Sequence, residues 1–208
     1  MYFRRLLSLT LLVFALSISA VGAAETGGLA EISDRLSKSP IVRASFTQKR
    51  HVEALTRPLL TEGKMVFAEN QGLAWLVEAP FKTNLSLTRS HVTEWNEETA
   101  RQRTPLSTRP ALSALVTILM PILSADFEGL AENFVVEETV SENSWEVVLT
   151  PRGTAMFNII SSIEISGDSV VRELVVREAR GDWTQLLFTN YLPDATPLSA
   201  KELRYFQE

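Results

Sequence analysis

The sequence predicts a mainly β protein with a single domain, in which a strongly curved antiparallel sheet or barrel is covered by a long apolar helix. The 208 residues are 45% hydrophobic and 22% charged, which is typical of one globular domain. Nine to eleven segments alternate apolar and polar residues with the period of a strand. Between two sets of these segments lies one apolar stretch, residues 109–123, which has the composition of a buried helix.

Residues 1–24 have the pattern of a secretory signal peptide. Two arginines precede an apolar stretch that runs to Ala20, and small residues follow it. We expect cleavage after Ala23 or Ala24, which leaves residues 25–208 as the mature domain. An uncleaved anchor is the alternative, but the apolar stretch is shorter than the roughly 20 residues of a membrane-spanning helix.

The composition restricts the compartment and the partners. The chain has no cysteine, so it has no disulfide, thiolate metal site or lipid-modified cysteine. Removal of the first 24 residues takes away only Arg4 and Arg5, which changes the formal net charge from −5 to −7. Nucleic-acid binding depends on concentrated positive charge, so we expect no nucleic-acid partner. An exported protein without thiols fits the periplasm of a bacterium.

A short helix is expected at the start of the mature chain. Leu29, Ile32 and Leu36 follow the three-to-four spacing of a one-sided helix, and Pro40 disfavours its continuation.

The period then changes to two. Val42, Ala44 and Phe46 share one face of the next segment, and the residues between them are polar. This pattern predicts a half-exposed strand over residues 42–49. Further strands of the first half are expected at 63–69, 73–79, 84–88, 92–95 and 99–103.

The strand period returns after the middle of the chain. Strands are expected there at 134–138, 145–150, 158–166, 170–178 and 183–191, with turns between them. A flat sheet of this many strands would expose unpaired edges, so we expect it to curl or close.

The helix expected at residues 109–123 is the most informative segment. Ser107 or Thr108 is a suitable cap, Pro110 is tolerated in the first turn, and Pro121 should kink or end the helix. Its apolar residues surround the helix almost completely. Such a helix is buried on more than one side, or it covers something apolar that is not protein.

The motifs of catalysis are absent from the sequence. It has no glycine-rich phosphate loop, no Gly-x-Ser-x-Gly elbow and no His-Glu-x-x-His pair. His51 and His91 have no acid–base partner that the sequence identifies. Adjacent acidic residues on a strand point to opposite faces, so the pairs at 97–98 and 137–138 do not converge on a metal ion. We therefore expect no catalytic residue, no metal site and no cofactor, and thus no enzyme.

Several predicted strands are apolar on both faces. Leu73, Trp75 and Val77 lie on one side of their strand, while Ala74 and Leu76 lie on the other. Two interpretations remain open at this point. Either helices complete an ordinary core, or the sheet curves around an apolar cavity that the helix at 109–123 closes.

Three blocks of sequence resemble the LolA family of periplasmic carriers of outer-membrane lipoproteins. They are Val42–Lys49, the Gly, Trp and Pro at 63, 75 and 80, and Trp145–Arg152. The resemblance spans most of the mature chain. It implies a half-open antiparallel β-barrel with a helical lid, the fold of LolA and LolB.

The resemblance also implies a function. A carrier of this kind is a monomer that binds the acyl chains of a lipoprotein, accepts them from an inner-membrane exporter and passes them to an outer-membrane acceptor. We expect large apolar residues to line the acyl site. Those on the strands are Phe46, Phe67, Trp75, Leu85, Leu87, Trp145 and Phe188, and those on the lid are Leu112, Leu115, Leu119 and Ile122.

One residue departs from the family pattern. Carriers of the family have a basic residue where this chain has Glu69, and that residue is associated with latching the lid and with directional transfer. The sequence therefore leaves open whether this chain transfers the same cargo through the same contact of the lid. The alternatives are a divergent carrier of a non-protein, lipid-linked product and an envelope module that senses lipoproteins. A lipid hydrolase would need a nucleophile and a base that the sequence does not identify.

Overall fold

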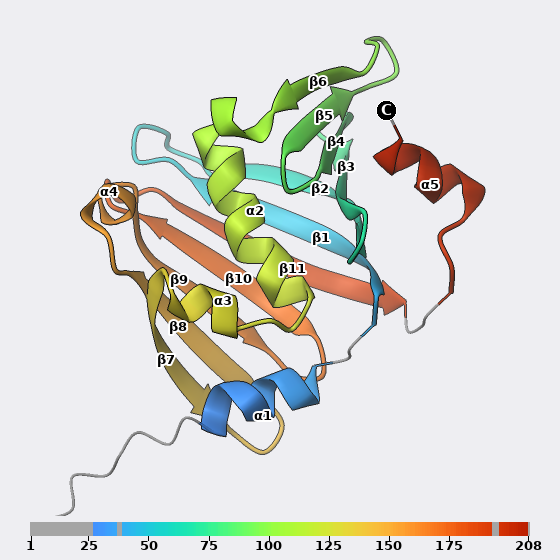
Figure 1. The fold of residues 1–208 in the computed structure, drawn as a ribbon. Coiled ribbons are helices and arrows are strands. Elements are labelled where there is room, and N and C mark those ends of the chain that lie inside the picture. Colours follow the sequence, from blue (N-terminus) through green and yellow to red (C-terminus); the bar gives the residue numbers. More distant parts are fainter. Residues whose placement is uncertain (1–26, 37–38, 193–195, 208) are drawn as a thin grey trace, which may run out of the picture.

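The computed structural model describes residues 27–36, 39–192 and 196–207 (Figure 1). The expected signal peptide lies outside these residues. The described chain forms an 11-stranded antiparallel sheet with helices around it. The strands are β1 (Ile41–His51), β2 (Leu59–Ala68), β3 (Gly72–Ala79), β4 (Thr83–Leu87), β5 (His91–Trp95), β6 (Gln102–Pro105), β7 (Phe134–Val140), β8 (Trp145–Pro151), β9 (Ile160–Gly167), β10 (Val171–Glu178) and β11 (Trp183–Leu192).

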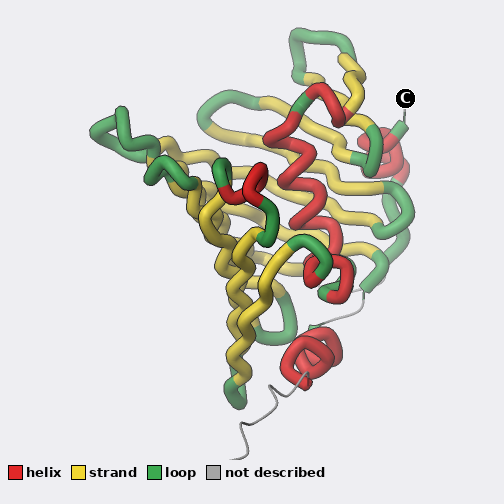
Figure 2. Tube along the Cα trace, turned by 60° about the vertical axis from the view of Figure 1, so that its left-hand side comes forward, coloured by secondary structure: helices red, strands yellow, loops and turns green. Residues whose placement is uncertain are grey.

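The sheet is a meander that is interrupted once. Its order is β6-β5-β4-β3-β2-β1-β11-β10-β9-β8-β7, so the first and last strands of the chain pair in the middle. The sheet curves around α2, and its edge strands β6 and β7 do not pair with each other (Figure 2). The predicted mainly β fold, a strongly curved and unclosed antiparallel sheet, is confirmed.

The helices are few and mostly short. They are α1 (Gly27–Arg35), the 3₁₀ turn η1 (Leu106–Thr108), α2 (Pro110–Leu123), α3 (Glu128–Ala131), α4 (Thr154–Phe157) and α5 (Ala200–Phe206). The sequence predicted α1 and α2 but not α3, α4 or α5. The chain after β11 had no predicted element, and there α5 forms the outer cover that is described below.

Local hydrogen bonds explain two strand boundaries that were predicted wrongly. The Asn96 side chain accepts bonds from the backbone N–H groups of Glu98 (2.8 Å) and Thr99 (2.6 Å), which makes a turn, so β6 begins at Gln102 and not at Thr99. The strand expected at 158–166 begins at Ile160, because the helical turn of α4 extends to Phe157.

The predicted ends of α2 were also partly wrong. The N-cap residue is Arg109, without a side-chain cap, and the Thr108 hydroxyl donates instead to the carbonyl of Pro105 at 2.7 Å. Pro121 lies inside the helix, which continues to Leu123. Pro121 removes one backbone hydrogen-bond donor from the last turn of α2. The turn is retained because burial of its apolar side chains, Ile122 and Leu123, compensates for the lost hydrogen bond.

The inner face of the sheet is apolar across its width. Cross-strand pairing places Ala44 opposite Met65, Met65 opposite Trp75 and Trp75 opposite Leu85, all on one face. Ala44, Met65 and Trp75 are at most 6% exposed. The helix α2 runs across this concave face (Figures 1 and 2).

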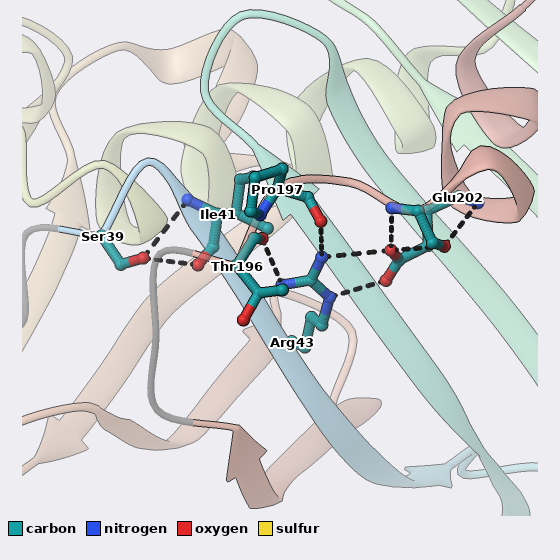
Figure 3. Close-up of polar contacts among 7 residues, drawn as sticks. Ser39, Ile41, Arg43, Thr196, Pro197 and Glu202 are labelled. Atoms are coloured by element: carbon teal, nitrogen blue, oxygen red, sulfur yellow. Dashed lines mark hydrogen bonds and ion pairs between the residues drawn. The ribbon is translucent and has the colours of Figure 1, made fainter.

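The outer face of β1 to β5 is covered by α5. Arg43 on β1 forms an ion pair with Glu202 at 2.6 Å and donates to the carbonyls of Thr196 and Pro197 (Figure 3). Tyr205 stacks on Trp95 of β5 with ring centroids 6.2 Å apart. Arg43 and Trp95 lie on the opposite face from Phe46 because of the alternation of strand side chains.

Side chains of β2 and β3 are buried on this outer face as well. Val66 is 6% exposed and Ala74 is fully buried, while Leu73 and Trp75 are buried on the inner face. The prediction that both faces of the strand at 73–79 are covered is therefore confirmed. It is α5 that packs against β3 on the outside.

Candidate functional site

An aromatic cluster forms the centre of the inner face. Phe46 stacks on Trp75 with ring centroids 3.8 Å apart and planes at 22°, and Phe188 meets Trp75 edge-on at 6.3 Å and 87°. These residues come from β1, β3 and β11. Gly63 makes the space for the cluster, because a Cβ there would lie 2.8 Å from the Phe46 ring and 2.1 Å from the Leu76 carbonyl oxygen.

Trp145 closes the other half of the inner face. Its ring meets Phe127 edge-on at 6.3 Å, and its indole N–H donates to the carbonyl of Asp168 at 2.7 Å. A Cβ at Gly167 would lie 2.7 Å from the Trp145 ring. The apolar body of Trp145 therefore stays in the interior while its polar group is satisfied at the end of the sheet.

The helix α2 covers this face through apolar side chains. Ile118, Leu119 and Ile122 are 1–2% exposed, whereas Thr117 points to solvent and bonds only to the Ser113 carbonyl of its own helix. The spacing of the buried residues follows one helical face. Apolar contact is thus the main force that holds the middle of α2 against the sheet.

Among the described residues, the polar bonds that tie α2 to other elements lie near its ends. Before the helix, the Leu106 N–H donates to the Ser90 carbonyl at 2.9 Å. After it, the Ser33 hydroxyl of α1 donates to the carbonyl of Ala125 at 2.9 Å. Ala125 has a φ of 55°, in the left-handed region that costs a residue with a side chain about 1 kcal/mol.

A small cavity lies beside α2 in the part of the chain that the structure describes. A cavity of about 30 Å³ lies between the C-terminal end of α2 and the sheet, lined by Leu36, Val42, Ile122, Tyr191 and their neighbours. A cavity of this size holds about one water molecule. Burial there raises the pKa of the Tyr191 hydroxyl, which donates to the Val171 carbonyl. We call this arrangement, in which α2 lies against the inner face of the sheet, the closed form.

The residues predicted to line an acyl site lie together in this interior. Leu85 and Leu112 are half-buried. The side chain of Leu115 lies outside the described residues, although its backbone belongs to α2. The others are nearly fully buried: Phe46, Phe67, Trp75, Leu87, Leu119, Ile122, Trp145 and Phe188.

The sequence prediction missed several interior residues. Val116 and Ile118 lie on the buried face of α2, Phe127 is the N-cap residue of the short helix α3, and Leu130 belongs to α3. Ile118 stands four residues before Ile122 and could have been found from that spacing. The position of α3 has no comparable pattern, because a four-residue helix is too short to show a period.

Glu69 lies at the end of the sheet where α2 ends. It follows β2, and its backbone N–H donates to the Pro40 carbonyl at 3.0 Å. Its side chain is exposed and lines an open groove of about 340 Å³ together with Met120 and Ser124 of the α2 end. No hydrogen bond joins the Glu69 side chain to α2 in the described residues, so the polar tie at this end comes from Ser33.

The titratable groups do not converge on a reactive centre. Within the described ranges, no three metal-ligating side chains gather where they would hold an ion. The His51 ring stacks on Trp183 at 5.5 Å, and the Nδ1 atom of His91 lies 2.9 Å from the Ser90 hydroxyl.

Comparison with known proteins places the chain in a family. The model of the family described as outer membrane lipoprotein carrier protein LolA-like matches residues 21–204. The chain belongs to this LolA-like family. The family is one of carriers, and its description concerns proteins of the bacterial envelope. A search of curated proteins finds no match.

Solved structures share the LolA-like fold at low sequence identity. MucB matches with a TM-score of 0.53 and 12% identity, over 87% of this chain and 63% of MucB. A DUF1329 family protein from Desulfovibrio piger matches with a TM-score of 0.50 and 12% identity, over 86% and 96% of the two chains. The LolA superfamily protein NE2245 from Nitrosomonas europaea matches with a TM-score of 0.48 and 7% identity, over 86% and 96%.

In the described part of this LolA-like chain, no helix combines the length and the hydropathy that a bilayer crossing requires.

Proposed function

We propose that this chain is a periplasmic carrier that holds the acyl chains of a lipoprotein, or of a related acylated lipid, between α2 and the inner face of the sheet. Membership of the LolA-like family supports the proposal. In this proposal residues 1–24 direct export and are removed, residues 25–208 form the carrier domain, and the monomer moves between an exporter in the inner membrane and an acceptor in the outer membrane.

The observation that carries the proposal is the kind of contact that α2 makes. The side chains of Ile118, Leu119 and Ile122 are nearly fully buried against an apolar sheet, and the polar ties lie outside this middle part of the helix. Acyl chains offer the sheet the same type of contact, at about 0.8 kcal/mol for each buried methylene. Cargo can therefore replace the helix without leaving a buried polar group unsatisfied.

The closed form supplies the means of release. Once cargo has left, α2 returns to the inner face and recovers its own burial, so empty protein does not expose the aromatic cluster of Phe46 and Trp75. A partner protein moves the equilibrium only if it binds the open and closed forms with different affinity. The acceptor and the exporter are expected to bind the form with α2 displaced.

Glu69 favours a second candidate cargo. It places a negative charge in the groove beside the end of α2, where carriers that the sequence resembles have a positive one. A lipid-linked product whose polar part is not a lipoprotein peptide is the alternative cargo. Native mass spectrometry of protein isolated from the periplasm would separate the two candidates by the mass of the released molecule.

A reversible lock on α2 tests the proposed function. The chain has no cysteine, so a Glu69→Cys, Ser124→Cys variant carries two unique thiols, both from residues that line the same groove. A short bis-methanethiosulfonate reagent should tie the end of α2 to the β2–β3 turn. We expect the tied protein to lose binding of a fluorescent triacylated lipopeptide and to recover it after reduction.

The matched controls are the two single-cysteine variants with the same reagent, which should bind the lipopeptide normally. Binding by the fully tied protein would contradict a site beneath α2.

A further inference from the structure

The exposed apolar residues gather at one end of the sheet. At this end, β1, β3, β5, β8 and β10 finish and β2, β4, β6, β7, β9 and β11 begin; we call it the loop end. Six of the exposed large hydrophobic residues in the described chain lie there, with exposures from 44% to 81%. They are Leu55, Leu59, Leu60, Phe81, Phe157 and Ile159. The opposite end has Leu192, at 62%.

These side chains project from separate connections. Leu55 and Leu59 belong to the β1–β2 connection, Phe81 to the β3–β4 turn and Phe157 to α4. The β1–β2 connection and α4 stand out on the same side of the molecule (Figure 1). Phe81 is 81% exposed. Isolated exposed hydrophobics are normal, but six at one end mark an interaction surface.

The charges of the loop end nearly balance. Its five strand-to-strand connections, residues 51–59, 79–83, 95–102, 151–160 and 178–183, contain five basic and five acidic residues, and the segment that leads into β7 adds the exposed Glu132. The whole chain has a formal net charge of −5. A surface with almost no net charge on an acidic protein does not favour anionic or cationic partners. It suits a partner that is apolar beneath a neutral polar layer.

We infer that the loop end docks on the surface of a zwitterionic lipid bilayer, with Phe81 as its deepest contact. Projecting apolar side chains on separate connections do not form the groove that a peptide or helix would fill. A fluid bilayer needs no complementary shape, and it takes up such side chains by burying them at the boundary between headgroups and acyl chains. Lys82 follows Phe81 directly and forms an ion pair with Glu97 at 2.9 Å, so the charge beside Phe81 is balanced.

The experiment measures partition of the purified protein onto vesicles of phosphatidylethanolamine and phosphatidylcholine by flotation. We expect binding that changes little between low and high salt and that Phe81→Ser weakens about tenfold, which is the effect of removing part of one buried aromatic side chain. Phe157→Ser should weaken it by a smaller factor. Both positions are exposed, so thermal unfolding should be unchanged.

Leu192→Ser is the matched control, because Leu192 is 62% exposed at the opposite end. It should leave vesicle binding unchanged. Equal loss in this variant, absence of binding to neutral vesicles, or binding that requires anionic lipid and disappears in salt would each overturn the inference. So would a dimer in solution that Phe81→Ser dissociates, because the loop end would then bind a second copy.

The inference is independent of the proposed cargo site. The protein with α2 tied to the β2–β3 turn should still bind vesicles, since the tie lies at the opposite end of the strands. Vesicle binding without lipopeptide binding would therefore refute the carrier proposal alone, and the reverse result would refute bilayer docking alone.

Discussion

The helices α2 and α5 cover opposite faces of one sheet, and different forces hold them. Leu119 and Ile122 of α2 are 1% exposed, whereas α5 has no buried residue. Instead, α5 is joined to the sheet by the Arg43–Glu202 ion pair, the stacking of Tyr205 on Trp95 and donation from Arg101 to the last carbonyls of the helix.

This difference separates a replaceable cover from a specific one. Apolar contact is not directional, so another apolar molecule can take the place of α2. Charge-assisted hydrogen bonds require fixed geometry and favour one partner, so α5 has no equivalent substitute. The side of the sheet that we propose for cargo is the side with the non-directional contact.

The largest expected effect is at the centre of α2. Leu119→Ala should reduce the free energy of unfolding by about 3 kcal/mol, because it removes a nearly fully buried side chain and leaves a cavity. Urea denaturation measures the loss. Leu203→Ala on α5, where the side chain is 41% exposed, should change it by less than about 0.5 kcal/mol. Equal losses would remove the contrast between the two helices.

The second effect is at the ion pair of α5. Arg43→Met should cost about 2 kcal/mol, since it removes the guanidinium that donates to the half-buried Glu202 carboxylate and to two carbonyls. Hydrogen exchange should increase in α5 while the backbone of α2 stays as protected as before. Lys64→Met is the control on the same face of the sheet. Both side chains of the Lys64–Glu78 ion pair are exposed, so the pair contributes little to the free energy of unfolding.

The same pair predicts a pH dependence. The Arg43 guanidinium holds the pKa of Glu202 at about 2, below its ordinary value of 4.5. The unfolded chain therefore binds a proton at Glu202 before the native one does, so this contribution is complete above pH 4.5 and is lost as the pH falls from 4.5 to 2. The wild-type protein should lose about 1 kcal/mol more stability over this range than Glu202→Gln. Parallel urea titrations at pH 7 and pH 3 measure the difference, and identical losses in the two proteins would contradict it.

The smallest effect is expected at the end of α2. Ser33→Ala removes the hydroxyl that donates to the Ala125 carbonyl and should cost about 0.5–1 kcal/mol. Faster hydrogen exchange in the last turn of α2 would report it. Thr117→Ala is the control, because the Thr117 hydroxyl bonds only within its own helix and points to solvent. Ser33→Thr should restore the protection.

Most strands could be predicted because they have one face against the core, whereas no residue of β6 is buried. Val42, Ala44 and Phe46 alternate with polar residues, and that period survives into β1 as the structure has it. The start of β2 was missed because Leu59 and Leu60 are adjacent and both exposed, so they break the alternation. Some strands begin or end at a turn, such as the turn at Asn96. Such a turn is formed by side-chain hydrogen bonds, which the alternation of apolar and polar residues does not reveal.

The helix α5 could be predicted from the sequence only in part. α5 begins with a capping box, in which the Ser199 hydroxyl accepts from the Glu202 N–H and the Glu202 carboxylate accepts from the Ser199 N–H. The Ser-x-x-Glu spacing at 199–202 is visible in the sequence and could have marked this helix. Its docking to Arg43 could not, because the two partners are far apart in the chain. For the same reason the sequence did not show that α2 itself fills the expected cavity.

The pairing of β1 with β11 has a consequence for how the molecule is made. Strands β1 to β6 can pair as local hairpins while the rest of the chain is still being synthesised. The other edge of β1 stays unpaired until β11 has been synthesised. The pairing of β1 with β11 joins residues as far apart in the sequence as Arg43 and Leu192, so it is a slow, non-local step of folding. During that interval the open border is a template for a strand of another copy, and crowded nascent chains would aggregate there unless a chaperone shields it.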